Sequence, residues 1–146
     1  MQSWLLPGSI ANASSVHAYG REARSALEEA REEVASAVGA GHSREIIFTS
    51  GATEANNAVL CGIGNGHVVT TAGDHPSVLD VVRTAPEHSV VPLEAGGWVD
   101  PFKLEQVLRS DTALCSVIWV NNETGVINDL PAISEVCRSK GVPLHV

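Results

Sequence analysis

Hydrophobic residues recur along this chain with two alternating spacings, which predict helices and strands in turn. The clearest helix is predicted over Arg21 to Val38, because its apolar positions follow helical spacing and charged residues fill the other face. Gly39 supplies the expected stop. Later helices are predicted over 53–63, 76–83, 100–108 and 129–138, and strands over 45–49, 68–71, 89–93, 113–120 and 142–146.

This alternation of strands and helices predicts an α/β fold with a mainly parallel sheet and helices on both faces. Parallel neighbours need a crossover connection, and a helix usually provides it. Pro92 places 89–93 at an edge of the sheet, because proline cannot donate a ladder hydrogen bond. The mostly apolar 113–120 is predicted as a buried strand, and Asp100 and Asp129 as helix N-caps.

The chain length and the last predicted strand bear on the number of domains and on association of the isolated chain. A chain of 146 residues is long enough for one core, so we expect a single partial domain over 1–146. The last predicted strand stops at Val146. We therefore expect an unpaired sheet edge and association of the isolated chain.

Composition and charge narrow the class of partner. The chain is 44% hydrophobic and 18% charged, as soluble globular proteins are, and its net charge is −8. This acidic balance argues against binding to nucleic acid or an anionic membrane, so small molecules or other proteins are the expected partners. Cys61, Cys115 and Cys137 are odd in number and lie in apolar segments, and their spacing matches no zinc site. We expect no metal, buried structural thiols and a cytoplasmic location.

The first candidate site is the turn from Thr49 to Glu54, where a predicted strand runs into a helix through small residues. Gly51 and Ala52 let an anion approach the backbone, the helix start offers unpaired N–H groups, and Thr53 adds a hydroxyl donor. This pattern predicts a phosphate site. The alternative is an ordinary helix capped by Ser50 or Thr53, and the segment matches neither a Walker loop nor a GxGxxG fingerprint.

Two further candidates follow later strands, at the sheet edge where ligands of such folds bind. His75 lies at the start of a helix, where its imidazole can stack on a flat cofactor and transfer protons, although it can equally be a turn residue. Asn121 to Gly125 follows the most apolar strand, so its carboxamides are ligand candidates, with a capped turn as the alternative. His145 alternates with apolar neighbours, which favours a packed, hydrogen-bonded side chain.

Taken together, these segments resemble the cysteine desulfurases of the class V aminotransferase group, which are fold-type I pyridoxal-phosphate enzymes. The resemblance is carried by Ser14 to Ala23, Phe48 to Asn57, His75 and Val120 to Gly125, in this order. It implies the N-terminal part of the large, cofactor-binding domain. It also implies that Ala52 and Thr53 contact the phosphate of pyridoxal 5'-phosphate. His75 would stack on the ring and act in catalysis, and Asn122 would bond near the ring oxygen.

The resemblance also implies an activity for the intact protein. It would remove sulfur from L-cysteine to give alanine and an enzyme persulfide for iron-sulfur cluster or thio-cofactor assembly. A sulfur-acceptor protein and a homodimer are implied as well. The family's ring-nitrogen Asp, Schiff-base Lys and persulfide Cys match positions beyond Val146, so we expect residues 1–146 alone to be inactive or weakly cofactor-binding. Selenocysteine lyase or aminotransferase activity, a non-catalytic nucleotide-binding module and a nonenzymatic remnant remain alternatives.

Overall fold

The computed structural model describes residues 12–146, and the chain divides into two compact units, Met1–Phe48 and Thr49–Val146. The single domain expected from the chain length stays a prediction. Within the described residues, no helix is long and apolar enough to cross a membrane.

The first unit is built on a single long helix. Helix α1 (Ala18–Val38) begins ahead of the predicted Arg21 and ends at the predicted residue, where Gly39 takes a left-handed φ of 71°. The side chain of His17 caps its start by accepting a hydrogen bond from the Gly20 backbone N–H. A Cβ on Gly20 would lie 2.4 Å from the Ser15 carbonyl oxygen, so only glycine lets the preceding segment pack this closely.

The strand predicted over 45–49 is wrong. The chain forms a short 3-10 helix there, η2 (Ser43–Glu45), followed by extended residues that pair with no strand of the described chain. Ile47 is 80% exposed, and the carbonyl oxygen of Ile46 accepts a hydrogen bond from the side chain of Arg31. The apolar, β-branched composition gives this segment a local preference for extended backbone, but a strand forms only where a neighbouring backbone pairs with it.

The second unit carries a four-stranded, fully parallel sheet in the order β2-β1-β3-β4. The parallel α/β fold is therefore confirmed, and β2 lies at an edge as Pro92 predicted. Strands β3 and β4 are shorter than the predicted 113–120 and 142–146. The elements are α2 (Ala52–Gly62), β1 (His67–Thr71), α3 (Pro76–Val82), β2 (His88–Val91), α4 (Pro101–Val107), β3 (Thr112–Ser116), α5 (Leu130–Ser139) and β4 (Leu144–His145).

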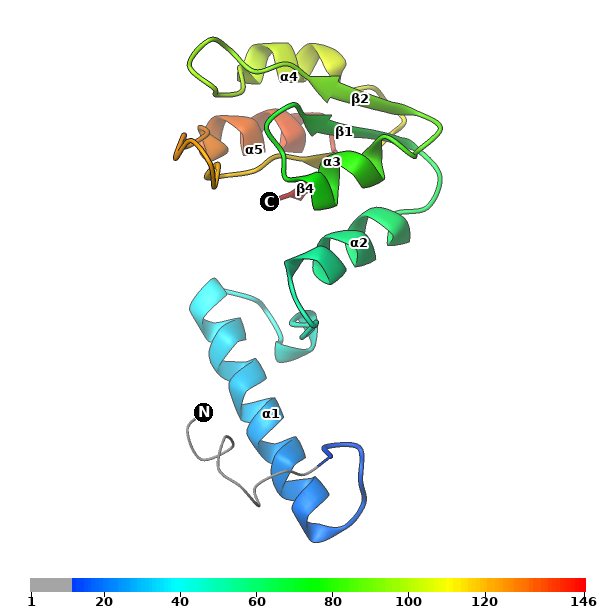
Figure 1. The fold of residues 1–146 in the computed structure, drawn as a ribbon, viewed down its shortest axis with the longest axis vertical. Helices are drawn as coiled ribbons and strands as arrows, with labels where there is room; N and C mark the ends of the chain where they lie inside the picture. The colour runs from blue at the N-terminus through cyan, green and yellow to red at the C-terminus, as the bar shows by residue number, and fades with distance from the viewer. Residues whose placement is uncertain (1–11) are drawn as a thin grey trace. The chain divides into compact units, whose positions relative to one another are not determined.

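Two apolar clusters cover the two faces of this sheet, and Figure 1 shows α4 and α3 on opposite sides of β1 and β2. On one face, Leu104 of α4 and Ile133 of α5 are buried in the same cluster as Val69. On the other face, Leu60 of α2 and Val78 of α3 pack with their own cluster. Helices on both faces are thus confirmed, and Asp100 and Asp129 cap α4 and α5 as expected.

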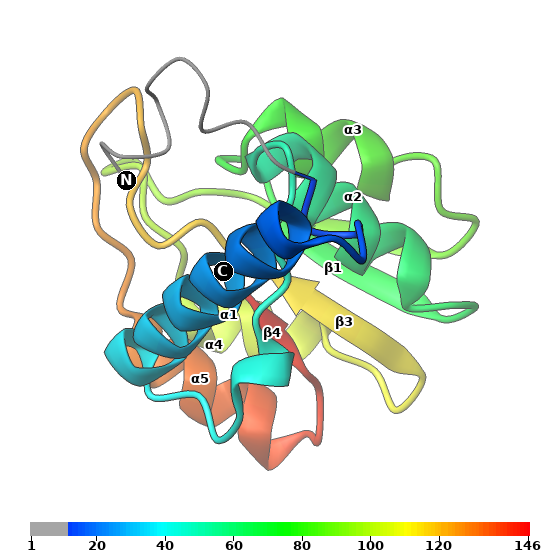
Figure 2. The same cartoon turned by 90° about the horizontal axis from the view of Figure 1, so that it is seen from below.

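The strand order creates a crevice at the carboxyl ends of the strands. From β1 the chain crosses through α3 to β2 on one side. Strand β3 lies on the other side of β1 and leads through α5 to β4 (Figure 2). The connections after β1 and β3 therefore run in opposite directions. Such a switch point opens the space outside the carboxyl ends of the strands, where ligands of open α/β sheets bind.

Candidate functional site

A cavity of about 200 Å³ lies at the carboxyl ends of β1, β3 and β4, at the switch point of the sheet. Polar and apolar side chains both line it. The lining residues are Asn56, Asp74, His75, Val78, Ser116, Val117, Ile118, His145 and Val146.

The loop after β1 presents His75 to this cavity and is fixed by a buried carboxylate. Asp74 is 7% exposed, and its Oδ2 accepts hydrogen bonds from the Thr70 hydroxyl at 2.7 Å and the Thr71 hydroxyl at 2.8 Å. The Thr71 backbone N–H donates to the same oxygen at 2.9 Å. Hydrogen bonds of this kind balance the cost of burying the charge. They also give the turn one conformation immediately before His75.

His75 is the N-cap of α3, and its ring is held by the residue two positions later. Its Nδ1 accepts a hydrogen bond from the Ser77 backbone N–H at 3.1 Å and lies 2.9 Å from the Ser77 hydroxyl. The Asn56 side chain on α2 donates to that hydroxyl at 2.9 Å. A chain of hydrogen bonds thus links α2 to the imidazole.

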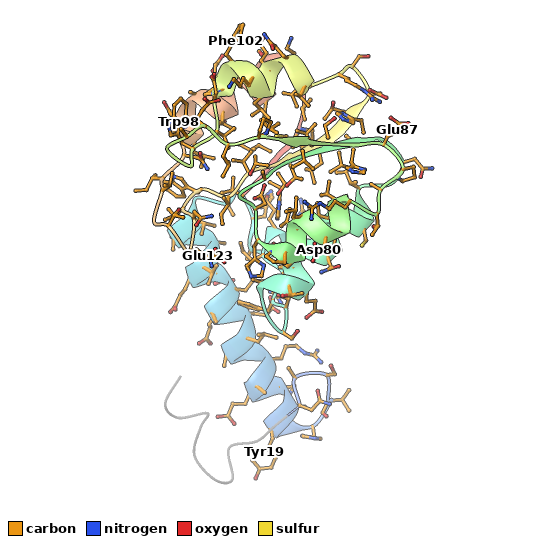
Figure 3. The ribbon with its side chains drawn as sticks, turned by 45° about the horizontal axis from the view of Figure 1, so that its top comes forward. Tyr19, Asp80, Glu87, Trp98, Phe102 and Glu123 are labelled. Atoms are coloured by element: carbon orange, nitrogen blue, oxygen red, sulfur yellow. The ribbon has the colours of Figure 1, made fainter. Side chains whose placement is uncertain are left out.

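The turn after β3 is held by Asn121. The Oδ1 atom of Asn121 accepts hydrogen bonds from the backbone N–H groups of Glu123 at 3.0 Å and Thr124 at 2.8 Å. Its Nδ2 donates to the carbonyl oxygen of Gly73 at 3.1 Å, in the loop that presents His75. Glu123, labelled in Figure 3, marks this turn. Asn122 is exposed beside these bonds.

The start of α2 is open to an anion. Its N-cap is Gly51, which offers no side-chain cap, and the first backbone bond runs from the Ala55 N–H to the Gly51 carbonyl. The N–H groups of the first turn, including those of Ala52 and Thr53, have no helical acceptor. Capping by Ser50 or Thr53 is therefore wrong.

A carboxylate lies close to this helix start. Glu54 accepts hydrogen bonds from both the hydroxyl and the backbone N–H of Ser50, each at 2.6 Å. These bonds lower the pKa of Glu54, so its carboxylate stays ionised at neutral pH. An anion bound at Ala52 and Thr53 would therefore lie near a second negative charge, the Glu54 carboxylate, which is hydrogen-bonded to Ser50.

Two polar residues meet at the floor of the cavity. The Ser116 hydroxyl at the end of β3 lies 2.9 Å from Nδ1 of His145 on β4. Burial lowers the pKa of His145, and the charge of Asp74 partly offsets this effect. The hydrogen-bonded His145 predicted from the sequence is confirmed, although its side chain also lines the cavity.

The structure brings the predicted site residues together only in part. His75 lines the cavity, whereas Ala52, Thr53 and Asn122 are exposed and are not among its lining residues. Asn56, on the same helix as Thr53, does line the cavity. Asn121, beside Asn122, does not, but it bonds to Gly73 in the loop that presents His75. The roles assigned to Ala52, Thr53, His75 and Asn122 stay predictions.

Sequence reasoning missed the residues that hold this arrangement. Asn56, Ser77 and Asn121 each bond to a segment far away in the chain. Asn121 lay in a segment singled out as carboxamides after a buried strand, and Asn56 in a segment that carries the family resemblance, but neither was assigned this role. Nothing in the order of residues signals the Asn56–Ser77 bond, because it depends on how α2 and α3 pack.

The thiols are free, and two of the three are buried. Cys115 and Cys137 lie in the core, where the hydrogen bond between them and their burial raise the pKa of Cys115. Cys61 is exposed, so its expected burial is wrong. The preceding Leu60 occupies the core face of α2, and the next position on a helix points about 100° away.

Comparisons with known proteins agree with this architecture. The family model described as aminotransferase class-V matches residues 4–146. The chain belongs to the class-V aminotransferase family. It is 42% identical over 157 residues to the cysteine desulfurase IscS of Shewanella amazonensis, covering 100% of this chain and 39% of that protein. It is 40% identical over 144 residues to IscS of Neisseria meningitidis serogroup C, covering 92% of this chain and 35% of that protein.

A solved structure supports the same membership. The class-V aminotransferase chain matches the structure of "SspA in complex with cysteine" with a TM-score of 0.89 and 29% identity, over 99% of this chain and 44% of that one. The predicted fold and the resemblance to cysteine desulfurases are thus confirmed. The chain spans well under half the length of the curated relatives it matches.

Class-V aminotransferases depend on pyridoxal 5'-phosphate, and the residues present fit this cofactor. The uncapped start of α2 suits a phosphate, and the imidazole of His75 offers a flat face beside the cavity. Both lysines lie elsewhere in the described chain: Lys103 pairs with Glu94 and Lys140 with Glu105. The described residues therefore supply cofactor-binding groups to the cavity but no lysine amine.

Proposed function

We propose that this chain forms part of the cofactor site of a pyridoxal-phosphate-dependent cysteine desulfurase. One observation carries the proposal: α2 and the loop after β1 both line one cavity at the switch point, and hydrogen bonds join α2 to the start of α3 and the turn after β3 to that loop. These are the segments that carry Ala52, Thr53, His75 and Asn122. The similar SspA structure is a complex with cysteine, which supports L-cysteine as the substrate.

Each residue has a role in this proposal that follows from its chemistry. The N–H groups of Ala52 and Thr53 and the Thr53 hydroxyl bind the phosphate at the positive end of α2. The imidazole of His75 covers one face of the ring and carries a proton on Nε2, the nitrogen that Ser77 does not engage. The Asn122 carboxamide donates to the ring oxygen and orients the substrate. When bound, the cofactor supplies an electron sink next to the reacting carbon.

The overall reaction transfers one sulfur atom. The bond between Cβ and sulfur of L-cysteine breaks, a sulfur–sulfur bond forms to an enzyme thiol, that thiol loses its proton and Cβ gains one. The products are alanine and an enzyme persulfide, from which a sulfur-acceptor protein would take sulfur for iron-sulfur cluster or thio-cofactor assembly. The family's persulfide Cys matches a position beyond Val146, so none of Cys61, Cys115 and Cys137 takes this role, and the last two are also buried.

Two further expectations belong to the same proposal. The free thiols at Cys61, Cys115 and Cys137 suit a reducing compartment, and we place the protein in the cytoplasm. We also propose that the whole enzyme acts as a homodimer. Because both lysines form ion pairs away from the cavity, residues 1–146 alone should release no sulfide from cysteine.

The site is tested by binding of pyridoxamine 5'-phosphate, which cannot form a Schiff base with surface lysines. We expect the chain to bind it more tightly than pyridoxamine, which lacks the phosphate, and more tightly than NAD or ATP. Thr53→Ala and His75→Ala should each weaken binding about tenfold, corresponding to about 1.4 kcal/mol. Ser43→Ala, in the first unit, is the control. Equal binding of both pyridoxamine forms, or tighter binding of NAD, would contradict the proposal.

The reaction is tested in a chimera in which residues 1–146 replace the matching segment of the Shewanella amazonensis IscS. We expect cysteine-dependent formation of alanine, which His75→Ala lowers by about a hundredfold or more, as for loss of a general acid or base. A chimera that shows the visible absorbance of bound cofactor but forms no alanine would count against the proposed reaction. Alanine formation unchanged by His75→Ala would exclude the proposed role of that residue.

A further inference from the structure

The hydrogen bonds of His75 fix which ring nitrogen carries the proton. A backbone N–H can only donate, so the 3.1 Å bond from the Ser77 N–H makes Nδ1 of His75 an acceptor. A neutral imidazole has one protonated nitrogen, and here that nitrogen must be Nε2. The hydrogen bonds within the described residues engage Nδ1 alone, which leaves the Nε2–H group for a ligand.

The Ser77 hydroxyl is directed by Asn56. Because Nδ1 of His75 is an acceptor, the Ser77 hydroxyl 2.9 Å away donates to it, and the Ser77 oxygen accepts from Nδ2 of Asn56 at 2.9 Å. Nδ1 thus receives two donors. Because Asn56 lies one helical turn after Ala52, the same face of α2 carries the proposed phosphate contact and this connection to the imidazole.

Core packing between α2 and α3 supports these residues. Leu60 of α2 packs with Val78 and Val82 of α3 in one buried cluster, which holds the two helices together below the Asn56–Ser77 bond. The distance between Asn56 and His75 is therefore set by core packing. A hydrogen bond between two such helices can orient a side chain precisely enough to matter for chemistry.

We propose that Asn56 and Ser77 are positioning residues that hold His75 with its proton on Nε2, so that its neutral ring offers the cavity a donor and no lone pair. This inference deepens the proposed function and rests on it for its role in catalysis. In that role His75 gives a proton from Nε2. The ring of His75 can accept a further proton only at Nδ1, and this would break the two hydrogen bonds from Ser77.

The arrangement is tested by long-range ¹H–¹⁵N correlation spectra of the chain labelled with ¹⁵N-histidine, with the His75 signals assigned through His75→Gln. We expect Nε2 at the frequency of a protonated nitrogen and Nδ1 at that of a hydrogen-bonded, unprotonated one. Ser77→Ala should move Nδ1 to higher frequency, since one donor is lost, and Ser77→Thr should restore it. Ser139→Ala makes the same chemical change on α5, where the hydroxyl bonds to Val136, and should leave His75 unchanged.

Asn56→Asp is the sharper variant, because it replaces the Nδ2 donor by an acceptor of the same shape. The Ser77 hydroxyl would then donate to the new carboxylate and turn its lone pairs to Nδ1, so the protonated fraction of Nδ1 should rise. Wild-type spectra with the proton on Nδ1, or His75 signals that are the same in wild type, Ser77→Ala and Asn56→Asp, would overturn the inference.

Binding of pyridoxamine 5'-phosphate separates this inference from the proposed function. We expect Ser77→Ala to weaken binding about three- to tenfold, as for loss of one hydrogen bond, with rescue by Ser77→Thr. If His75 shows the expected nitrogen signals but the chain binds no pyridoxamine 5'-phosphate, the proposed function fails and the hydrogen-bond arrangement stands. If binding is normal and the Ser77 and Asn56 variants leave both readouts unchanged, the inference fails and the proposed function stands.

Discussion

The Asn121 side chain donates a hydrogen bond to the Gly73 carbonyl oxygen at 3.1 Å and so joins the turn after β3 to the loop that presents His75. The same side chain accepts three hydrogen bonds from Glu123 and Thr124. Asn122, next in the chain, is exposed. The two neighbouring asparagines therefore have different roles: Asn121 stabilises the turn, and the exposed Asn122 is available for a ligand.

This division predicts opposite results for two matched substitutions. Asn121→Ala removes four hydrogen bonds and should lower the free energy of unfolding by about 1–3 kcal/mol. Asn122→Ala should change it by less than about 0.5 kcal/mol and instead weaken binding of pyridoxamine 5'-phosphate. Urea unfolding and ligand titration of both variants check this, and equal loss of stability in the two would contradict it.

Close contact between β1 and β3 predicts that Gly66 cannot be replaced without strain. A Cβ at Gly66 would lie 2.7 Å from the Cβ of Ala113, and neither atom can rotate away. Gly66→Ala should therefore cost about 1–3 kcal/mol in urea unfolding. Gly62→Ala is the matched control, because a Cβ there meets nothing within 4 Å and should be neutral or stabilising. Tolerance of Gly66→Ala would show that the strands lie further apart.

Stability should fall as the solution becomes acidic, and His67 is one cause. His67 is fully buried between Thr112 and Ser89, and burial, helped by the charge of Arg109, lowers its pKa. The unfolded chain then binds a proton more readily than the folded one. The stabilisation is complete above the unfolded pKa of about 6.5 and is lost as pH falls through the lower folded value.

The measurement is urea unfolding at pH values between about 7.5 and 5. His67→Gln, which can keep one hydrogen bond, should lower stability at neutral pH and flatten its decline on acidification. His42→Gln, on an exposed histidine of the first unit whose side chain caps no helix, is the control for the histidine-to-glutamine change. A His67→Gln profile as steep as that of the wild type would exclude His67 as a cause.

Thiol labelling should distinguish Cys61 from the two buried cysteines. Cys61 is exposed, whereas Cys115 and Cys137 are 0% and 1% exposed. The native chain should react with one equivalent of a thiol reagent rapidly and with three in denaturant. Cys61→Ser should remove the fast reaction. Rapid labelling of Cys115 or Cys137 in the native chain would show that the core between β3 and α5 opens.

Much of the fold could be predicted because local signals and packing agree. Helix α1 has a regular apolar face and Gly39 as its stop, and α4 begins at Asp100 as expected. The strand at 45–49 failed because no backbone of the described residues pairs with it. Strand ends such as that of β3 were also misjudged, because an apolar run continues past Ser116 while its ladder pairing with β4 stops there.

The candidate site was likewise predictable where local sequence signals suffice and not where tertiary packing decides. His75 was predictable from its place after a strand, and it does line the cavity. The Asn56–Ser77 and Asn121–Gly73 bonds join residues 21 and 48 positions apart, so they depend on tertiary packing that no local pattern records. Ala52 and Thr53 were predicted from the turn into a helix, and Asn122 from its place after a buried strand, while the family resemblance supplied their contacts with the cofactor. A bound ligand tests these contacts.

The most direct test is a ¹H–¹⁵N correlation spectrum of the labelled chain during titration with pyridoxamine 5'-phosphate. We predict shifts at the backbone amides of Ala52 and Thr53, around His75 and at Asn122, all with one dissociation constant, and smaller shifts with pyridoxamine. Shifts that leave any of these three segments unmoved, or that follow separate dissociation constants, would contradict the claim that they form one cofactor site.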